Sequence, residues 1–179
     1  MSDTGLLLQE ILKEISIDRN VDDISNIKDV TTKVQIYQFE VGGIKYIIQF
    51  ALDIIGSDTI LEISFRNLTA IEKLKSKKNS SVDDFYSELD RAKFGLTKTG
   101  NSFVVFNKIY NVVVKYIESK KPTYIKYEAV EDNRKKLYST LLKKAEKETA
   151  LKFERIFIDP GTDIMLTNTS QVVIYRIKI

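Results

Sequence analysis

The clearest pattern in the chain is an alternation of apolar and polar positions that predicts a three-stranded antiparallel meander. Residues 30–41, 44–53 and 59–67 are rich in β-branched and aromatic types, and apolar side chains recur at every second position in the second and third of these stretches. Tight turns at Gly42-Gly43 and at residues 56–58 separate the three stretches. One face of the meander is therefore apolar, and we expect that face to cover the core.

Three other stretches have apolar residues at helical spacing. The N-terminal stretch has Leu7, Leu8, Ile11, Leu12 and Ile15, and a polar loop over residues 18–29 follows it. Residues 103–117 have so wide an apolar stripe that we expect a largely buried helix. Their β-branched content also fits a strand, but polar residues at helical spacing favour the helix: Lys108, Asn111, Lys115 and Glu118. The third helix begins at Asp132 or Asn133 and stacks Leu137, Leu141 and Ala145.

Residues 68–94 are the least regular part of the chain. They contain a lysine-rich piece with Lys73, Lys75, Lys77 and Lys78, a break at residues 79–81 and a short predicted helix from Val82 to Leu89. The segment is interpreted either as a mobile lid or as a simple excursion from the fold.

Three short strands complete the pattern, over residues 123–128, 153–158 and 172–177. The order of elements is α-β-β-β-α-β-α-β-β. This order predicts an α+β protein with a single mixed, mostly antiparallel sheet and a central βαβ crossover. We expect residues 1–179 to form a single domain, in which both long helices cover one sheet.

Composition removes several classes of chemistry. The chain has 179 residues, no histidine and no cysteine, which excludes His- or Cys-based nucleophilic catalysis, disulfides and the usual zinc ligands. No metal is expected. Acid–base chemistry by carboxylate, tyrosine or lysine remains, as does anion binding by backbone amides, or no catalysis at all.

Charge is unevenly distributed although the net charge is only +3. Residues 91–154 contain fifteen basic and seven acidic side chains. This excess either attracts phosphates, on a cofactor or a nucleic acid, or forms ordinary solvated helix faces. No apolar stretch reaches the length of a membrane span and no signal sequence is evident, so we expect a cytoplasmic protein, in a host cytoplasm or a virion if viral.

The order of elements from residue 30 onward resembles the GNAT fold of acetyl-CoA-dependent N-acetyltransferases. In that family, amides of a glycine-bearing turn before the first long helix bind the pyrophosphate of coenzyme A. The turn falls here on Gly95-Leu96-Thr97-Lys98-Thr99-Gly100, of which only the last glycine fits the family pattern. The resemblance implies acetyl-CoA as the cofactor, bound through Lys98, Thr99, Gly100, Asn101 and Ser102.

The same resemblance implies two catalytic residues. The second helix of the family ends its motif with Leu-Tyr, and here Leu137-Tyr138 stands at that place. The tyrosine gives a proton to the departing thiolate, which assigns the general acid to Tyr138. The family's base lies on the last strand of the meander, where Glu62 is the acidic candidate.

A second resemblance covers residues 97–142. Thr-Gly-Asn before an apolar helix, a Lys-Pro ending, a short strand and Arg-x-x-Leu-Tyr-x-x-Leu are similar to a group of uncharacterised bacteriophage-encoded proteins. This similarity implies a viral origin and no particular activity.

The sequence therefore leaves two main hypotheses. One is transfer of an acetyl group from acetyl-CoA to an amine, with Tyr138 as acid and Glu62 or a water as base. The other is a non-catalytic phage accessory or virion protein that uses the same scaffold to bind another protein. Nucleic-acid binding ranks last, because no aromatic-glycine signature of a known module is present.

Overall fold

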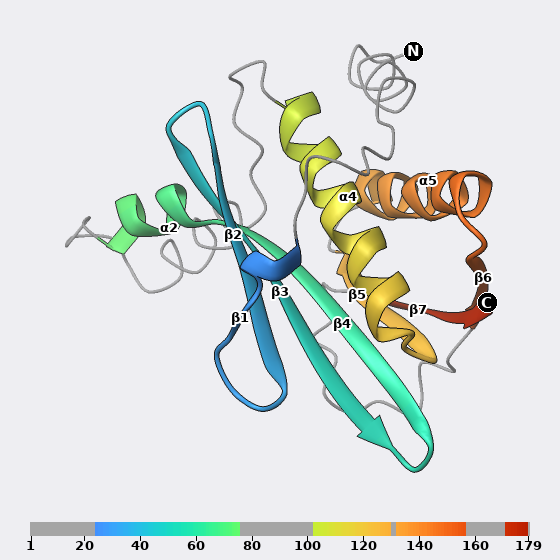
Figure 1. Cartoon of the computed structure of the whole chain (residues 1–179). Helices are drawn as coiled ribbons and strands as arrows, with labels where there is room; N and C mark the ends of the chain where they lie inside the picture. The colour runs from blue at the N-terminus through green and yellow to red at the C-terminus, as the bar shows by residue number, and fades with distance from the viewer. Residues whose placement is uncertain (1–23, 76–101, 130–131, 157–170, 179) are drawn as a thin grey trace, which may run out of the picture.

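One mixed sheet with helices packed against it forms the centre of the protein (Figure 1). The computed structural model describes residues 24–75, 102–129, 132–156 and 171–178. Its elements are, in chain order, η1 (Ile24–Asn26), β1 (Lys28–Asp29), β2 (Val34–Val41), β3 (Ile44–Ile55), β4 (Asp58–Asn67), α2 (Leu68–Lys75), α4 (Ser102–Lys120), β5 (Tyr124–Ala129), α5 (Asp132–Glu148), β6 (Lys152–Ile156) and β7 (Gln171–Lys178).

The sheet has seven strands in the order β1-β2-β3-β4-β5-β7-β6. All neighbouring strands of the described sheet are antiparallel except β4 and β5, which are parallel. Helix α4 lies between these two strands in the sequence, as parallel neighbours require a crossover. The predicted α+β class and single mixed sheet are confirmed.

The β2–β3 hairpin forms as the sequence predicts. Val41 pairs with Ile44, and the two-residue loop between them has φ values of 59° at Gly42 and 76° at Gly43. Positive φ at both positions is the geometry that joins two right-twisted strands, and glycine adopts it without a Cβ penalty.

Both long helices cover the same face of the sheet, which we call the helix face. Tyr116 of α4 stacks on Phe50 of β3 with ring centroids 4.0 Å apart, and Tyr138 of α5 contacts Tyr127 of β5 at 4.7 Å. The Tyr116 hydroxyl also donates a hydrogen bond of 2.6 Å to Gln35 on β2. The buried side chains form one cluster between these helices and the sheet.

The opposite face, which we call the polar face, has charged side chains in cross-strand pairs. Glu62 of β4 lies 3.3 Å from Lys126 of β5, and Glu154 of β6 lies 2.7 Å from Lys178 of β7. These pairs are largely exposed, so they contribute little to stability. Alternation along each strand thus separates an apolar face from a polar one.

Three predictions from the sequence are corrected. The strand predicted from residue 30 begins at Val34, because the Thr31 hydroxyl accepts hydrogen bonds from the amides of Lys33 and Val34 and holds a turn there. Part of the predicted loop over residues 18–29 forms η1 and β1. The segment predicted to be irregular from residue 68 begins with helix α2, because the Asn67 side chain caps it by accepting a 3.0 Å hydrogen bond from Ala70.

Asn111 belongs to the polar residues whose spacing indicates the helix α4, and its side chain is 0 % exposed. Its amide donates a 2.8 Å hydrogen bond to the Asn107 carbonyl one turn earlier, so the helix itself satisfies the buried amide. The predicted N-terminal helix and the predicted helix over residues 82–89 lie outside the described residues.

Two threonines fasten the beginning of the parallel pair. The Thr123 amide donates a 3.0 Å hydrogen bond to the Thr59 hydroxyl, and the Thr59 amide donates one of 3.2 Å to the Thr123 hydroxyl. Side chains therefore satisfy backbone donors at the point where β4 and β5 come together.

Thr123→Val keeps the shape of the side chain but leaves the Thr59 amide without its acceptor. We expect the free energy of unfolding to fall by about 1–2 kcal/mol, measured by urea denaturation. Thr123→Ser, which retains the hydroxyl, is the matched control and should stay close to the wild type. Equal stability of the valine variant and the wild type would contradict the role of this reciprocal pair.

Candidate functional site

The parallel strands β4 and β5 pair over only a short distance. Their register runs from Ile60–Tyr124 to Ile63–Tyr127. Beyond that point β4 continues along β3 to Asn67, and β5 continues along β7 to Ala129. No ladder joins β4 to β5 over these last residues in the described sheet. We call this opening the seam.

Among the residues that the structure describes, no strand pairs with β4 on the side from which β5 has separated. In an interior strand, successive residues direct their N–H and C=O groups to alternate neighbours, so residues after Ile63 present such groups to the opened side. An extended ligand with amide groups could pair with them as a strand would.

Ser64 is the first residue of β4 beyond the last β4–β5 pair. Its hydroxyl oxygen is buried and has no hydrogen-bond partner among the described atoms. Its neighbours Ile63 and Phe65 face the helices, so Ser64 faces the polar side of the sheet. A buried polar atom without a partner is uncommon and points to a bound water or ligand group at the seam.

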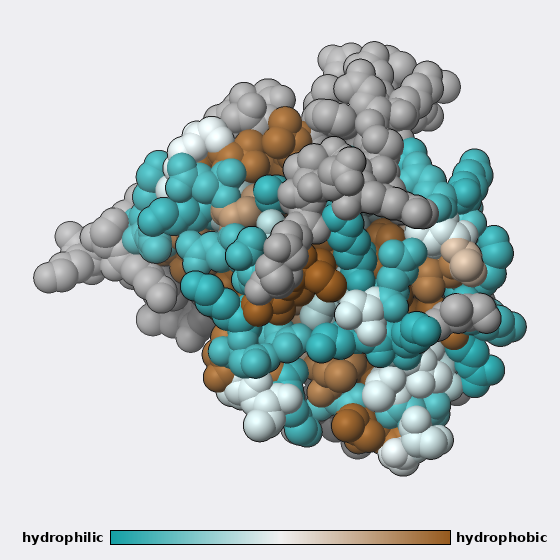
Figure 2. All heavy atoms as spheres, in the orientation of Figure 1, coloured by the Kyte–Doolittle hydropathy of each residue, from teal (hydrophilic) through white to brown (hydrophobic). Residues whose placement is uncertain are grey.

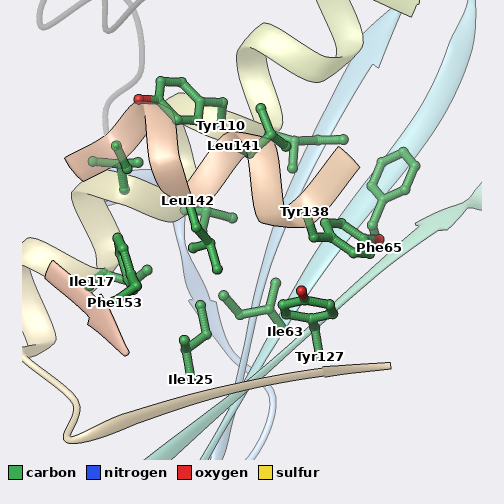
Figure 3. A pocket seen from close by; sticks show the side chains of 14 residues that line it. Ile63, Phe65, Tyr110, Ile117, Ile125, Tyr127, Tyr138, Leu141, Leu142 and Phe153 are labelled. Atoms are coloured by element: carbon green, nitrogen blue, oxygen red, sulfur yellow. The ribbon is translucent and has the colours of Figure 1, made fainter. Parts of the chain in front are cut away.

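An apolar cavity of about 70 Å³ lies on the helix face beside the seam. Figure 3 shows Phe65 of β4, Tyr127 of β5 and Tyr138 of α5 gathered at one end of it. The remaining wall is made by Ile63 of β4, Ile125 of β5, apolar side chains of α4 and α5, and Phe153 of β6. The cavity thus begins where β4 and β5 separate and continues between the helices and the sheet.

Tyr138, the predicted acid, therefore lies at the wall of this cavity. It is half-buried, and its ring centroid is 4.7 Å from that of Tyr127, at an interplanar angle of 52°. Burial, with a further contribution from a hydrogen bond with Tyr175, raises the pKa of Tyr127 above its usual range. Tyr127 is therefore a neutral wall of the cavity at physiological pH.

Glu62, the predicted base, lies on the opposite face of the sheet. It precedes Ile63, whose side chain lines the cavity, and it pairs with Lys126 at 3.3 Å. The structure does not place Glu62 and Tyr138 on the same face. Both residues lie close to the seam. Glu62 is one residue before the last β4–β5 pair, and Tyr138 contacts Tyr127 of that pair.

The predicted pyrophosphate site is only partly visible. Lys98, Thr99, Gly100 and Asn101 lie outside the described residues. Ser102 is the first residue of α4, so the helix begins directly after the predicted turn. The four amides of a helix N-terminus have no partner within the helix, which suits an anion at that end.

The sequence did not identify Ser64, Phe65 or Tyr127 as site residues. The alternation that makes them strand residues was visible, but no local signal marks the pair at which β4 and β5 part. In the described residues no cluster of three acidic side chains could hold a metal ion, and no helix is both long and apolar enough to cross a membrane.

Comparison with known proteins yields no relative. No protein-family model matches the chain, and neither a curated protein nor a solved structure matches it significantly.

At the far end of the cavity, Tyr110 of α4 donates a 2.8 Å hydrogen bond to Glu148 of α5. Burial is the main cause that raises the pKa of Tyr110, and the hydrogen bond and charge of Glu148 add to it. Lys144 lies 2.9 Å from the other oxygen of Glu148. The three side chains tie α4 to α5.

This raised pKa predicts a pH dependence. Above about pH 10 the Tyr110 hydroxyl ionises in the unfolded chain but stays protonated in the folded one. The folded state then binds more protons, so the stability contributed by Tyr110 is complete below pH 10 and is lost as the pH rises further.

We therefore expect Tyr110→Phe to be less stable than the wild type by about 1 kcal/mol at pH 7, because the bond to Glu148 is lost. The difference should shrink above pH 10, by at most about 1.4 kcal/mol per pH unit. Urea denaturation of the wild type and the variant at pH 7, 9, 10 and 11 measures this difference in the free energy of unfolding. Lysine ionisation affects both proteins equally. A difference that stays constant with pH would contradict the raised pKa of Tyr110.

Proposed function

We propose that the protein is a GNAT-like acyltransferase that moves an acyl group from a coenzyme A thioester to an amine. The single observation that carries the proposal is the seam between β4 and β5, which opens beside an apolar cavity with Tyr138 at its wall. After α2, which directly follows the meander, the order α4-β5-α5-β6-β7 supports the resemblance inferred from the sequence.

The residues at the seam suit such a thioester. Amide groups of its pantetheine arm could pair with the opened side of β4, and the buried Ser64 hydroxyl could satisfy one polar group there. The start of α4, together with the turn predicted from the sequence before it, would bind the phosphates. An acyl-CoA thioester, of which acetyl-CoA is the simplest, would supply the activated acyl group.

Residues of the chain would donate and accept the protons that the reaction transfers. As the amine nitrogen forms its bond to the acyl carbon and the carbon–sulfur bond breaks, Tyr138 would give its hydroxyl proton to the sulfur. Glu62, or a water beside it, would take the proton that the amine loses. Because Glu62 and Tyr138 lie on opposite faces, the amine would approach from the polar face, through the seam.

Tyr138→Phe tests the chemical step. We expect its kcat for acyl transfer to fall by about 10²–10⁴-fold, while its Kd for coenzyme A stays within about twofold of the wild-type value. Calorimetry gives the Kd, and a thiol-release assay with a panel of amines gives the rate.

Tyr110→Phe is the matched control, because it also removes a tyrosine hydroxyl from the cavity wall, but one that is bonded to Glu148. Gly100→Glu should abolish coenzyme A binding. Gly161→Glu introduces the same charge elsewhere in the chain and is the control, so it should still bind coenzyme A. The proposal fails if neither coenzyme A nor acetyl-CoA binds at millimolar concentration.

One observation favours a second function, the binding of another protein. The end of the β3–β4 hairpin has two adjacent isoleucines, of which Ile54 is 70 % exposed and Ile55 is 63 % exposed. Brown, hydrophobic atoms are visible near this end of the hairpin in Figure 2. Adjacent exposed isoleucines at the tip of a strand pair are typical of a contact surface.

A double substitution Ile54→Ser and Ile55→Ser should therefore release a partner that the wild type retains in a pull-down from the native host. Val104→Ser, at an exposed valine of α4, is the control and should retain it. Retention of the same partner by all three proteins would rule out the hairpin as the contact.

A further inference from the structure

The cavity beside the seam is larger than an acetyl group requires. Its volume is about 70 Å³, and its wall consists of aliphatic and aromatic side chains of five elements. An engineered apolar cavity of about 150 Å³ accepts benzene, which has six carbons. By that scale the present cavity holds roughly three carbons, which is the number a butyryl group has beyond its carbonyl carbon.

Water is a poor occupant of this space. A buried water needs two to four polar partners, and two of the three tyrosine hydroxyls at the wall already have partners elsewhere. Tyr110 donates to Glu148, and Tyr127 forms a hydrogen bond with Tyr175. A hydrocarbon segment fits the lining better than water does.

The position of the cavity indicates which part of a bound thioester would enter it. Phe65, Tyr127 and Tyr138 stand at the end nearest the seam, and Ile117 and Phe153 lie toward the other end (Figure 3). A thioester held with its sulfur beside Tyr138 would direct its acyl chain away from the seam, between α4, α5 and the sheet.

We infer that the acyl group carried by this protein is a short aliphatic chain of about four carbons, of the butyryl class, and not acetyl. The inference rests on the proposed function and specifies its donor. Ile63, Leu142 and Ala145 would contact the chain, since all three line the cavity.

The test is a series of coenzyme A thioesters with straight acyl chains of two, three, four, six and eight carbons, titrated by calorimetry against free coenzyme A. Each methylene buried should tighten binding about fourfold. We therefore expect butyryl-CoA to bind about fifteenfold more tightly than acetyl-CoA, and the eight-carbon thioester to gain nothing beyond butyryl.

Two variants should change the preferred length of the acyl chain in opposite directions. Ala145→Leu fills the cavity, so butyryl-CoA should bind at most twofold more tightly than acetyl-CoA, and acetyl-CoA should still bind. Leu142→Ala enlarges it and should shift the optimum to six carbons. Ala51→Leu, on the polar face of β3, is the matched control and should keep the wild-type preference.

The outcomes separate this inference from the function on which it rests. Thioesters that bind with affinities independent of chain length would overturn the four-carbon donor and leave the acyltransferase proposal intact. Absence of binding by coenzyme A and every thioester would overturn both. If folded Ala145→Leu still prefers butyryl-CoA as strongly as the wild type, the acyl chain binds outside this cavity and the inference is overturned.

Discussion

The short parallel contact between β4 and β5 is the constraint on which the rest of the structure depends. Two reciprocal threonine hydrogen bonds fasten its beginning, and the ladder ends after Ile63–Tyr127. Since parallel strands cannot be joined by a tight turn, the chain must leave the sheet and return. Helix α4 lies on that return path, and its burial covers the middle of the sheet.

The burial of α4 explains its unusual composition. A helix that is apolar over most of its circumference must be enclosed, and α4 is enclosed by the sheet below it and by α5 beside it. The stacked rings of Phe50 and Tyr116 fix it over β3, and the Tyr110–Glu148 hydrogen bond fixes it to α5. The cavity is the space that remains where these surfaces meet at the seam.

The two faces of the sheet have different physical roles. The helix face excludes water and supplies most of the apolar burial, while the exposed ion pairs of the polar face add little stability. The seam is where the two environments meet, with Tyr138 on one side and with Ser64 and Glu62 on the other. That juxtaposition gives the acyltransferase proposal its geometry.

The sequence by itself determined the elements, because alternation and helical spacing are local consequences of which side chains avoid water. It predicted the meander, the glycine hairpin, both long helices and the α+β class. It missed the turn at Thr31 and the cap at Asn67, where one polar side chain redirects the backbone. Only the tertiary structure decided where β4 and β5 part, that Tyr138 lines a cavity beside that point and that Asn111 is buried. The point where the strands part depends on pairing between segments far apart in the chain, such as Thr59 and Thr123 at a separation of 64 residues, and no local pattern encodes that pairing.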